Sequence, residues 1–172
     1  MKAPYAWFYC APDIDNFQTF LNYLVHSLKN LNAEFGEKSL ELASSLSDLI
    51  SKDEENSINA VIATFVNEFT SVFEKDEYLV IDDLHNLGSP SWLSSAFNNL
   101  VESFPANLHI IITSRTTPDF NTAKLSAKRN LLRIESGDLN FDPEETEKLL
   151  NEIYGISHSR DDLNVLEDRI EG

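Results

Sequence analysis

The sequence predicts an α/β fold in which helices cover both faces of a parallel sheet. Short runs of β-branched and aromatic residues alternate along the chain with longer segments in which apolar residues recur every three or four positions. Such alternation is typical of parallel sheets, because each strand returns to the same direction through a crossover helix. The 172 residues, of which 42% are hydrophobic and 24% charged, are enough for one globular domain with its own core.

The first half of the chain is expected to form two strands with helices between them. An apolar strand covers residues 5–10, and Asp15 is expected to cap the helix after it. A second strand is predicted at 78–81, where Tyr-Leu-Val-Ile is a short apolar run. Apolar periodicity predicts the intervening helices at residues 16–31, 37–51 and 58–73.

The second half continues the alternation. Ser91 is expected to cap a helix that ends before Pro105, and the buried strand at residues 108–112 follows. Residues 131–135, Leu-Leu-Arg-Ile-Glu, are predicted to be a last strand.

A helical extension is predicted after that strand, at about residues 142–171. Asp142 and Glu145 have the spacing of a capping box, with Pro143 as the first helical residue. Gly155 lies where a helix end requires a positive φ, and Ser159 begins a final helical pattern. We therefore expect a single domain over residues 1–172, with an α/β core at about 5–136.

The candidate site residues follow the predicted strands directly. Asp82 and Asp83 come after the strand at 78–81, and Arg115 comes just after the strand at 108–112. The carboxyl ends of parallel strands meet at one edge of a sheet, where ligands bind. Two carboxylates suit Mg²⁺ and an attacking water, and a guanidinium suits phosphate. The alternatives are a core strand that ends in an acidic turn and an Arg115 that pairs with Asp82, Asp83 or another nearby carboxylate.

Composition excludes several classes of function. The chain has 29 acidic and 13 basic residues, a net charge of −16, which argues against direct binding of nucleic acid. Cys10 is the single cysteine, so no disulfide can form within the chain, and a buried thiol is expected. No apolar run is long enough for a membrane span, and the start is more like a strand than a signal peptide. A cytoplasmic protein is the expectation.

Four segments in this order resemble the nucleotide-binding domain of STAND-class signalling ATPases, specifically the MalT-like, LuxR-type transcription regulators. They are residues 6–24 (AWFYCAPDIDNFQTFLNYL), 78–85 (YLVIDDLH, like a Walker B strand), 108–118 (LHIIITSRTTP, like a sensor strand) and 138–145 with Leu139, Phe141, Glu144 and Glu145. Together they cover nearly the whole chain.

The resemblance implies roles for four residues. Asp82 would coordinate Mg²⁺ as the Walker B carboxylate, and Asp83 would polarise water. Arg115 would sense the terminal phosphate of ATP, and His85 would have a supporting role. The family also implies a P-loop NTPase fold of three layers, with ATP and Mg²⁺ as cofactors.

The main departure from the family is the P-loop. The chain has 5 glycines and none of them belongs to a G-x-x-x-x-G-K-[ST] loop. We therefore interpret the chain as a part of a larger regulator, and this part lacks the P-loop strand and helix. The remaining parts of such a regulator, the P-loop segment and the helical sensor and DNA-binding modules, would be its partners. The polypeptide alone is expected to be inactive as an ATPase.

The missing strand has a structural consequence. In this family the strand order is 5-1-4-3-2, and the P-loop strand is number 1. Without it, the strand at 131–135 must pair with the strand at 108–112, pair with another chain, or remain an exposed edge. Our hypothesis is a rearranged sheet or one completed by self-association.

Two further readings remain open. The chain can be a degenerate NTPase-like domain that acts as a protein-interaction module through a free sheet edge. It can also be a piece of another AAA+-like ATPase.

Overall fold

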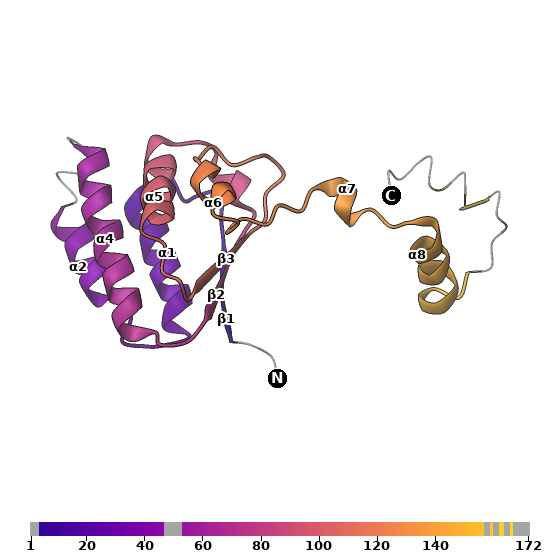
Figure 1. Ribbon diagram of the computed structural model, residues 1–172, viewed down its shortest axis with the longest axis horizontal. Helices are drawn as coiled ribbons and strands as arrows, with labels where there is room; N and C mark the ends of the chain where they lie inside the picture. The colour runs from indigo at the N-terminus through magenta and orange to yellow at the C-terminus, as the bar shows by residue number, and fades with distance from the viewer. Residues whose placement is uncertain (1–3, 47–52, 157–158, 160–161, 164–165, 167–172) are drawn as a thin grey trace. The chain divides into compact units, whose positions relative to one another are not determined.

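The computed structural model describes residues 4–46, 53–156, 159, 162–163 and 166. The chain divides into two compact units, Met1–Lys128 and Arg129–Gly172. The first unit is an α/β structure, as the sequence predicts (Figure 1). Its elements are β1 (Tyr5–Tyr9), α1 (Phe17–Lys29), α2 (Glu37–Ser45), α4 (Glu54–Val72), β2 (Glu77–Asp82), the 3₁₀-helix η1 (Leu84–Leu87), α5 (Ser91–Glu102), β3 (Leu108–Ile112) and α6 (Ala123–Ala127).

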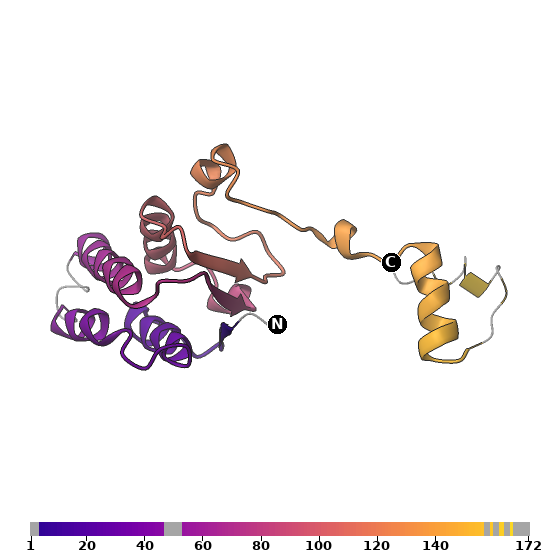
Figure 2. The same ribbon diagram turned by 60° about the horizontal axis from the view of Figure 1, so that its bottom comes forward.

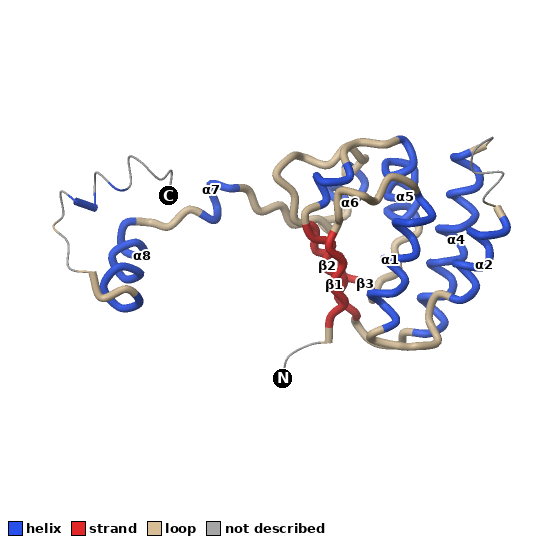
Figure 3. Tube along the Cα trace, turned by 180° about the vertical axis from the view of Figure 1, so that it is seen from behind, coloured by secondary structure: helices blue, strands red, loops and turns tan. Residues whose placement is uncertain are grey.

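The sheet has three parallel strands in the order β1-β2-β3 (Figure 2). Both connections therefore cross the sheet in the same direction, and crossovers of this kind are right-handed. They place their helices on the same face, and α1, α2, α4 and α5 lie together on one side of the sheet (Figures 1 and 3). On the other face, the side chains of Trp7 and Ile111 are 53% and 51% exposed. Among the described residues of this unit no helix covers that face, so the predicted second helical layer is not confirmed.

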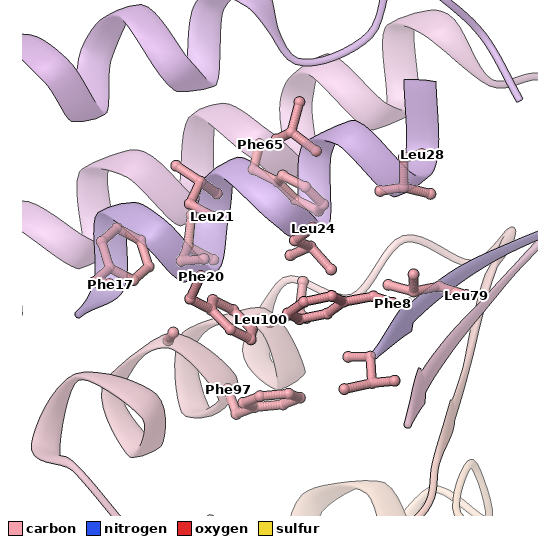
Figure 4. Packing of buried hydrophobic residues seen from close by; sticks show 14 of the residues in the cluster. Phe8, Phe17, Phe20, Leu21, Leu24, Leu28, Phe65, Leu79, Phe97 and Leu100 are labelled. Atoms are coloured by element: carbon pink, nitrogen blue, oxygen red, sulfur yellow. The ribbon is translucent and has the colours of Figure 1, made fainter. Parts of the chain in front are cut away.

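The core lies between the covered face of the sheet and the helices. Alternate residues of β1 point into it, so Ala6 and Phe8 are buried while Tyr5 and Trp7 are not. Phe8 packs edge-on against Phe20 with ring centroids 5.4 Å apart. Figure 4 shows the helical side chains that meet the sheet, among them Phe20, Leu24, Phe65, Phe97 and Leu100.

Two helix caps lie one residue away from their predicted positions. Asn16, and not Asp15, caps α1, because its side-chain oxygen accepts a hydrogen bond from the Thr19 N–H at 2.9 Å. Ser91 is the first residue of α5 and not its cap. The Ser91 hydroxyl instead donates to a carboxylate oxygen of Glu54 on α4 at 2.6 Å.

A buried carboxylate connects α4 to the start of α2. Glu68 is 5% exposed and accepts hydrogen bonds from the N–H groups of Lys38 and Ser39, both at 3.1 Å, and from the Ser39 hydroxyl at 2.5 Å. Burial raises the pKa of Glu68, but these hydrogen bonds outweigh burial, so the pKa lies below its ordinary value. The carboxylate thus supplies the cap that α2 lacks within its own sequence.

The second unit begins with short helices. They are α7 (Ser136–Leu139), α8 (Pro143–Lys148) and the π-helical turn η2 (Leu149–Ile153). The predicted capping box is confirmed, because Asp142 accepts from the Glu145 N–H and Glu145 accepts from the Asp142 N–H. Gly155 has the predicted positive φ, 64°.

The predicted strand at residues 131–135 is wrong. These residues form no strand, and Leu132 and Ile134 are 82% and 58% exposed. A strand needs a hydrogen-bonding partner, and the sheet formed by the described residues has β2 as the only neighbour of β3. A rearranged sheet is therefore not observed in the part of the chain that the structure describes, and completion by another chain stays a prediction.

Two predicted helical segments lie partly outside the described residues. They are the end of the helix at 37–51 and most of the helix that begins at Ser159. None of the helices that the structure describes combines the length and the apolar character needed to cross a bilayer.

Candidate functional site

The carboxyl edge of the sheet brings the predicted site residues together. Asp82 is the last residue of β2 and Asp83 follows it, while Arg115 follows β3 by three residues. The 3₁₀-helix η1 begins directly after Asp83, and His85 is its second residue. Cys10 follows β1 at the same edge, where its N–H donates to the carbonyl oxygen of Asp82 at 2.9 Å.

One hydroxyl connects the two strand ends. The Thr113 Oγ1 atom donates to Oδ1 of Asp82 at 2.5 Å and accepts from the backbone N–H of Asp83 at 2.9 Å. The backbone of Thr113 adds two bonds to the same turn, since its N–H donates to the Ile81 carbonyl and its own carbonyl accepts from the Leu84 N–H, each at 3.0 Å. Thr113 therefore orients the Asp82 carboxylate.

Asp83 has a left-handed backbone, with φ 55° and ψ 44°. This conformation is uncommon for a residue other than glycine, and Asp tolerates it better than most. It turns the chain from β2 into η1 and brings His85 Nδ1 to 3.9 Å from Oδ1 of Asp83. The same imidazole nitrogen accepts from the backbone N–H of Arg115 at 3.4 Å. His85 thus lies between the acidic turn and the loop that carries Arg115.

The Arg115 side chain is exposed. Within the part of the chain that the structure describes, its guanidinium forms no ion pair with Asp82 or Asp83. The alternative that Arg115 serves as their salt-bridge partner is therefore not observed among the described residues.

The acidic pair also acts on Cys10. The thiol is fully buried, and burial, followed by the charges of Asp82 and Asp83, raises its pKa to about 12. It remains a protonated, unreactive packing group. Asn86 holds η1 against the same segment, because its side-chain amide donates to the Cys10 carbonyl at 3.0 Å.

Two of these connecting residues were not predicted from the sequence. Thr113 lies in the sensor-like segment at 108–118 without a predicted role of its own, and Asn86 is not singled out. The position of Thr113, first after a buried strand that lies next to the acidic one, is a signal that could have identified it. Nothing in the local sequence of Asn86 indicates its contact with Cys10.

The described residues offer only part of a magnesium site. Two carboxylates at one edge are hard oxygen ligands of the right kind. However, no group of three or more His, Cys, Asp or Glu side chains in the described ranges is arranged to hold a metal ion. A Mg²⁺ ion held by these two carboxylates would need further oxygen ligands, such as those of phosphate.

Comparisons with known proteins place this chain near two kinds of bacterial protein. It is 27% identical to the HTH-type transcriptional regulator MalT of Vibrio campbellii over 163 residues, which are 93% of this chain and 17% of the regulator. The values for MalT of Vibrio cholerae are 27% over 170 residues, 98% of this chain and 18% of the regulator. The serine/threonine-protein kinase PknK of Mycobacterium tuberculosis is 27% identical over 172 residues, 99% of this chain and 14% of the kinase.

The chain is thus distantly related to one region of MalT-type transcriptional regulators, over nearly its whole length. It spans 14–18% of the length of these three relatives. No family model matches it.

Proposed function

We propose that this chain is part of an ATP-binding switch domain in a MalT-like, signal-responsive transcription regulator. The observation that carries the proposal is the meeting of Asp82, Asp83 and Arg115 at the carboxyl ends of adjacent parallel strands. Two carboxylates after one strand and a guanidinium after its neighbour suit the metal and the phosphates of a nucleotide. The similarity to MalT over most of the chain supports the regulator context.

Each residue has a role in this proposal that its geometry allows. Asp82, oriented by the Thr113 hydroxyl, would hold Mg²⁺ that is bound to nucleotide phosphates. Asp83, which turns the chain from β2 into η1 through its left-handed backbone, would orient water. Arg115 would bind the terminal phosphate and stabilise charge that develops on it, and His85 would position the Arg115 loop through its backbone. A bound Mg·ATP would supply the remaining metal ligands.

The polypeptide of 172 residues is expected to bind Mg·ATP weakly and to leave it unhydrolysed. A P-loop supplies backbone N–H groups and a lysine to the phosphates, and no such loop occurs in this sequence. Calorimetry with Mg·ATP on the chain and on Asp82→Ala and Arg115→Ala tests this. Asp119→Ala, an exposed acidic residue on the same loop as Arg115, is the control.

Each of the three possible results of the calorimetry is informative. No detectable heat for any variant agrees with a site that needs a separate phosphate-binding segment. Binding of Mg·ATP that weakens in both site variants and not in the control would contradict the need for a separate phosphate-binding segment. The same result would support the assignment of Asp82 and Arg115 to the site. Binding that all variants share equally would contradict the proposed site.

The coding sequence upstream of Met1 tests the regulator context. A Gly-Lys-Thr or Gly-Lys-Ser loop about 20–30 residues before Ala6 supports the switch domain. Its absence supports the second candidate, a degenerate NTPase-like protein-interaction module. The half-exposed aromatic face of the sheet is the observation that favours this candidate.

A further inference from the structure

One edge of the sheet has no neighbouring strand among the described residues. The strand at this edge is β1, which pairs only with β2 (Figure 2). The N–H of Cys10 donates to the Asp82 carbonyl at 2.9 Å, and the direction of the backbone groups alternates along a strand. The N–H and C=O groups of Tyr5, Trp7 and Tyr9 therefore face the free edge. It is not the edge beside β3, where the missing P-loop strand is expected.

The β1 edge lacks the features that usually keep sheet edges apart. Natural proteins protect a free edge with charged side chains, proline, a bulge or a covering segment. The strand Tyr-Ala-Trp-Phe-Tyr has no charge and no proline, and it pairs with β2 in unbroken register. Tyr5, Trp7 and Tyr9 are 58%, 53% and 51% exposed, so the described residues leave about half of each side chain open. The edge can therefore accept another strand.

The residues of β1 read almost the same in both directions. When two copies pair antiparallel about Trp7, Tyr5 lies opposite Tyr9 and Trp7 lies opposite its own equivalent. All of these pairs use the backbone groups that face the free edge, so two hydrogen bonds form at each, about six in total. Aromatic side chains directly opposite each other also stabilise antiparallel strands. A two-fold axis at Trp7 thus satisfies both edges with one set of contacts.

The helix packed on β1 carries charges that suit the same axis. α1 lies against β1, where the ring of Tyr23 stacks on that of Phe8 with centroids 6.4 Å apart. Asp13 and Asp15 precede this helix at the carboxyl end of β1, and Lys29 ends it near the amino end. Antiparallel pairing brings the Lys29 end of one copy to the aspartates of the other. The charges of the two copies are therefore complementary at both ends of the contact.

The low charge of this part of the chain also favours a second copy. The net charge of −16 opposes contact between two copies at most surfaces. Residues 4–30, however, contain only two of the 29 acidic residues, Asp13 and Asp15, and one basic residue, Lys29. Two copies that meet along β1 and α1 therefore avoid most of the repulsion.

We propose that two copies of this chain associate through the free edges of their β1 strands, which pair antiparallel about Trp7 and join the two sheets into one. The contact is the edge of the sheet and not its exposed face. This inference goes beyond the proposed function and does not depend on nucleotide chemistry.

Sedimentation equilibrium of the 172-residue chain measures the association, and we expect a monomer–dimer equilibrium. Trp7→Lys places two lysines opposite each other on the axis and should raise the dimer dissociation constant at least about tenfold. Ile111→Lys is the matched control, because Ile111 lies in the same row and on the same face and is 51% exposed, but belongs to β3 at the other edge. It should change the dissociation constant by less than about twofold. Circular dichroism confirms that each variant is folded.

A cysteine on the axis tests the geometry of the dimer. Opposite residues of an antiparallel pair have Cα atoms about 5.5 Å apart, which is within the reach of a disulfide. Oxidised glutathione should therefore convert Trp7→Cys into a covalent dimer. Ile111→Cys should stay monomeric under the same conditions, as should the unmodified chain, whose Cys10 is buried.

Charge reversal tests the complementarity of the two ends. Lys29→Glu should weaken association by about threefold or more at low salt, because it faces Asp13 and Asp15 of the other copy. Adding Asp13→Lys to this variant should restore part of the loss.

Three outcomes overturn the proposal. One is an unmodified chain that stays monomeric up to about 1 mM. Another is association that Trp7→Lys and Ile111→Lys weaken equally, which would assign the contact to the exposed face of the sheet. The third is association that Trp7→Lys leaves intact, together with a Trp7→Cys variant that forms no covalent dimer.

Discussion

Thr113 is the residue on which the geometry of the acidic turn depends most. Its hydroxyl donates to Asp82 and accepts from the Asp83 N–H, so Thr113→Val removes both hydrogen bonds and keeps the shape of the side chain. We expect Thr113→Val to lower the free energy of unfolding by about 1–2 kcal/mol and Thr113→Ser to cost clearly less. Urea denaturation of the three proteins measures this. Equal stability of the Val and Ser variants would show that the hydroxyl does not hold the turn.

The lowered pKa of Glu68 predicts how the free energy of unfolding depends on pH. Its pKa in the folded chain lies below the ordinary value of 4.5, because the bonds from Lys38 and Ser39 outweigh burial. Its contribution is therefore fully present above about pH 4.5 and is lost as the pH falls through the lowered pKa. We expect Glu68→Gln to cost about 1–3 kcal/mol at pH 7 and to flatten the decrease of stability in acid.

Denaturation curves between pH 3 and pH 7 measure this effect. The control is Glu55→Gln, which removes an exposed carboxylate from the same helix. A Glu55→Gln variant that loses as much stability as Glu68→Gln would contradict a specific role for the buried carboxylate.

At the level of single elements, Gly36 and Gly88 form a natural pair. Both have positive φ, 92° and 66°, so alanine is strained at each. A Cβ atom at Gly36 would lie 2.0 Å from Cγ1 of Val25 on α1, whereas nothing lies within 4 Å of one at Gly88. We expect Gly88→Ala to cost about 1 kcal/mol from backbone strain alone and Gly36→Ala to cost clearly more, because α1 and α2 must also move apart. Thermal unfolding of both variants tests the difference, and equal costs would contradict close packing at Gly36.

The elements that sequence predicts well are those whose signal is local. The helices α1 and α4 and all three strands of the sheet follow from periodicity and apolar runs within each segment. The segment 131–135 has an equally good local pattern, but a strand also needs a neighbour, which local pattern does not reveal. The cap of α1 differs by one residue because Asn16 and Asp15 are both good caps, and local sequence does not choose between them.

The same distinction applies to the candidate site. That Asp82 and Arg115 lie at one edge follows from strand order and direction, which sequence can predict. The left-handed backbone of Asp83 and the bridge through Thr113 depend on contacts between residues 30 positions apart. The exposed face of the sheet opposite the helices is likewise a property of the whole sheet, because it depends on both crossovers lying on the same side.

At the scale of the whole molecule, the boundary at Lys128 gives the last prediction. The hydrophobic core cluster contains residues between Ala6 and Leu108, and large apolar side chains of the second unit such as Leu139 and Tyr154 are exposed. A chain that ends at Lys128 should therefore keep the urea midpoint of the full chain, with a free energy of unfolding within about 0.5 kcal/mol. A chain that ends at Asn107 is the control, since it lacks β3 and should not fold cooperatively.

The truncation decides between the two units and the single domain that the sequence predicts. If residues 129–172 contributed to one cooperative domain, their removal would lower both the midpoint and the slope of the urea transition, because the slope scales with the surface exposed on unfolding. If they form a separate unit, the transition of the first unit keeps its midpoint and slope. A truncated chain that loses more than about 1 kcal/mol would show that residues after Lys128 stabilise the sheet, and the core would then have to be extended beyond Leu108.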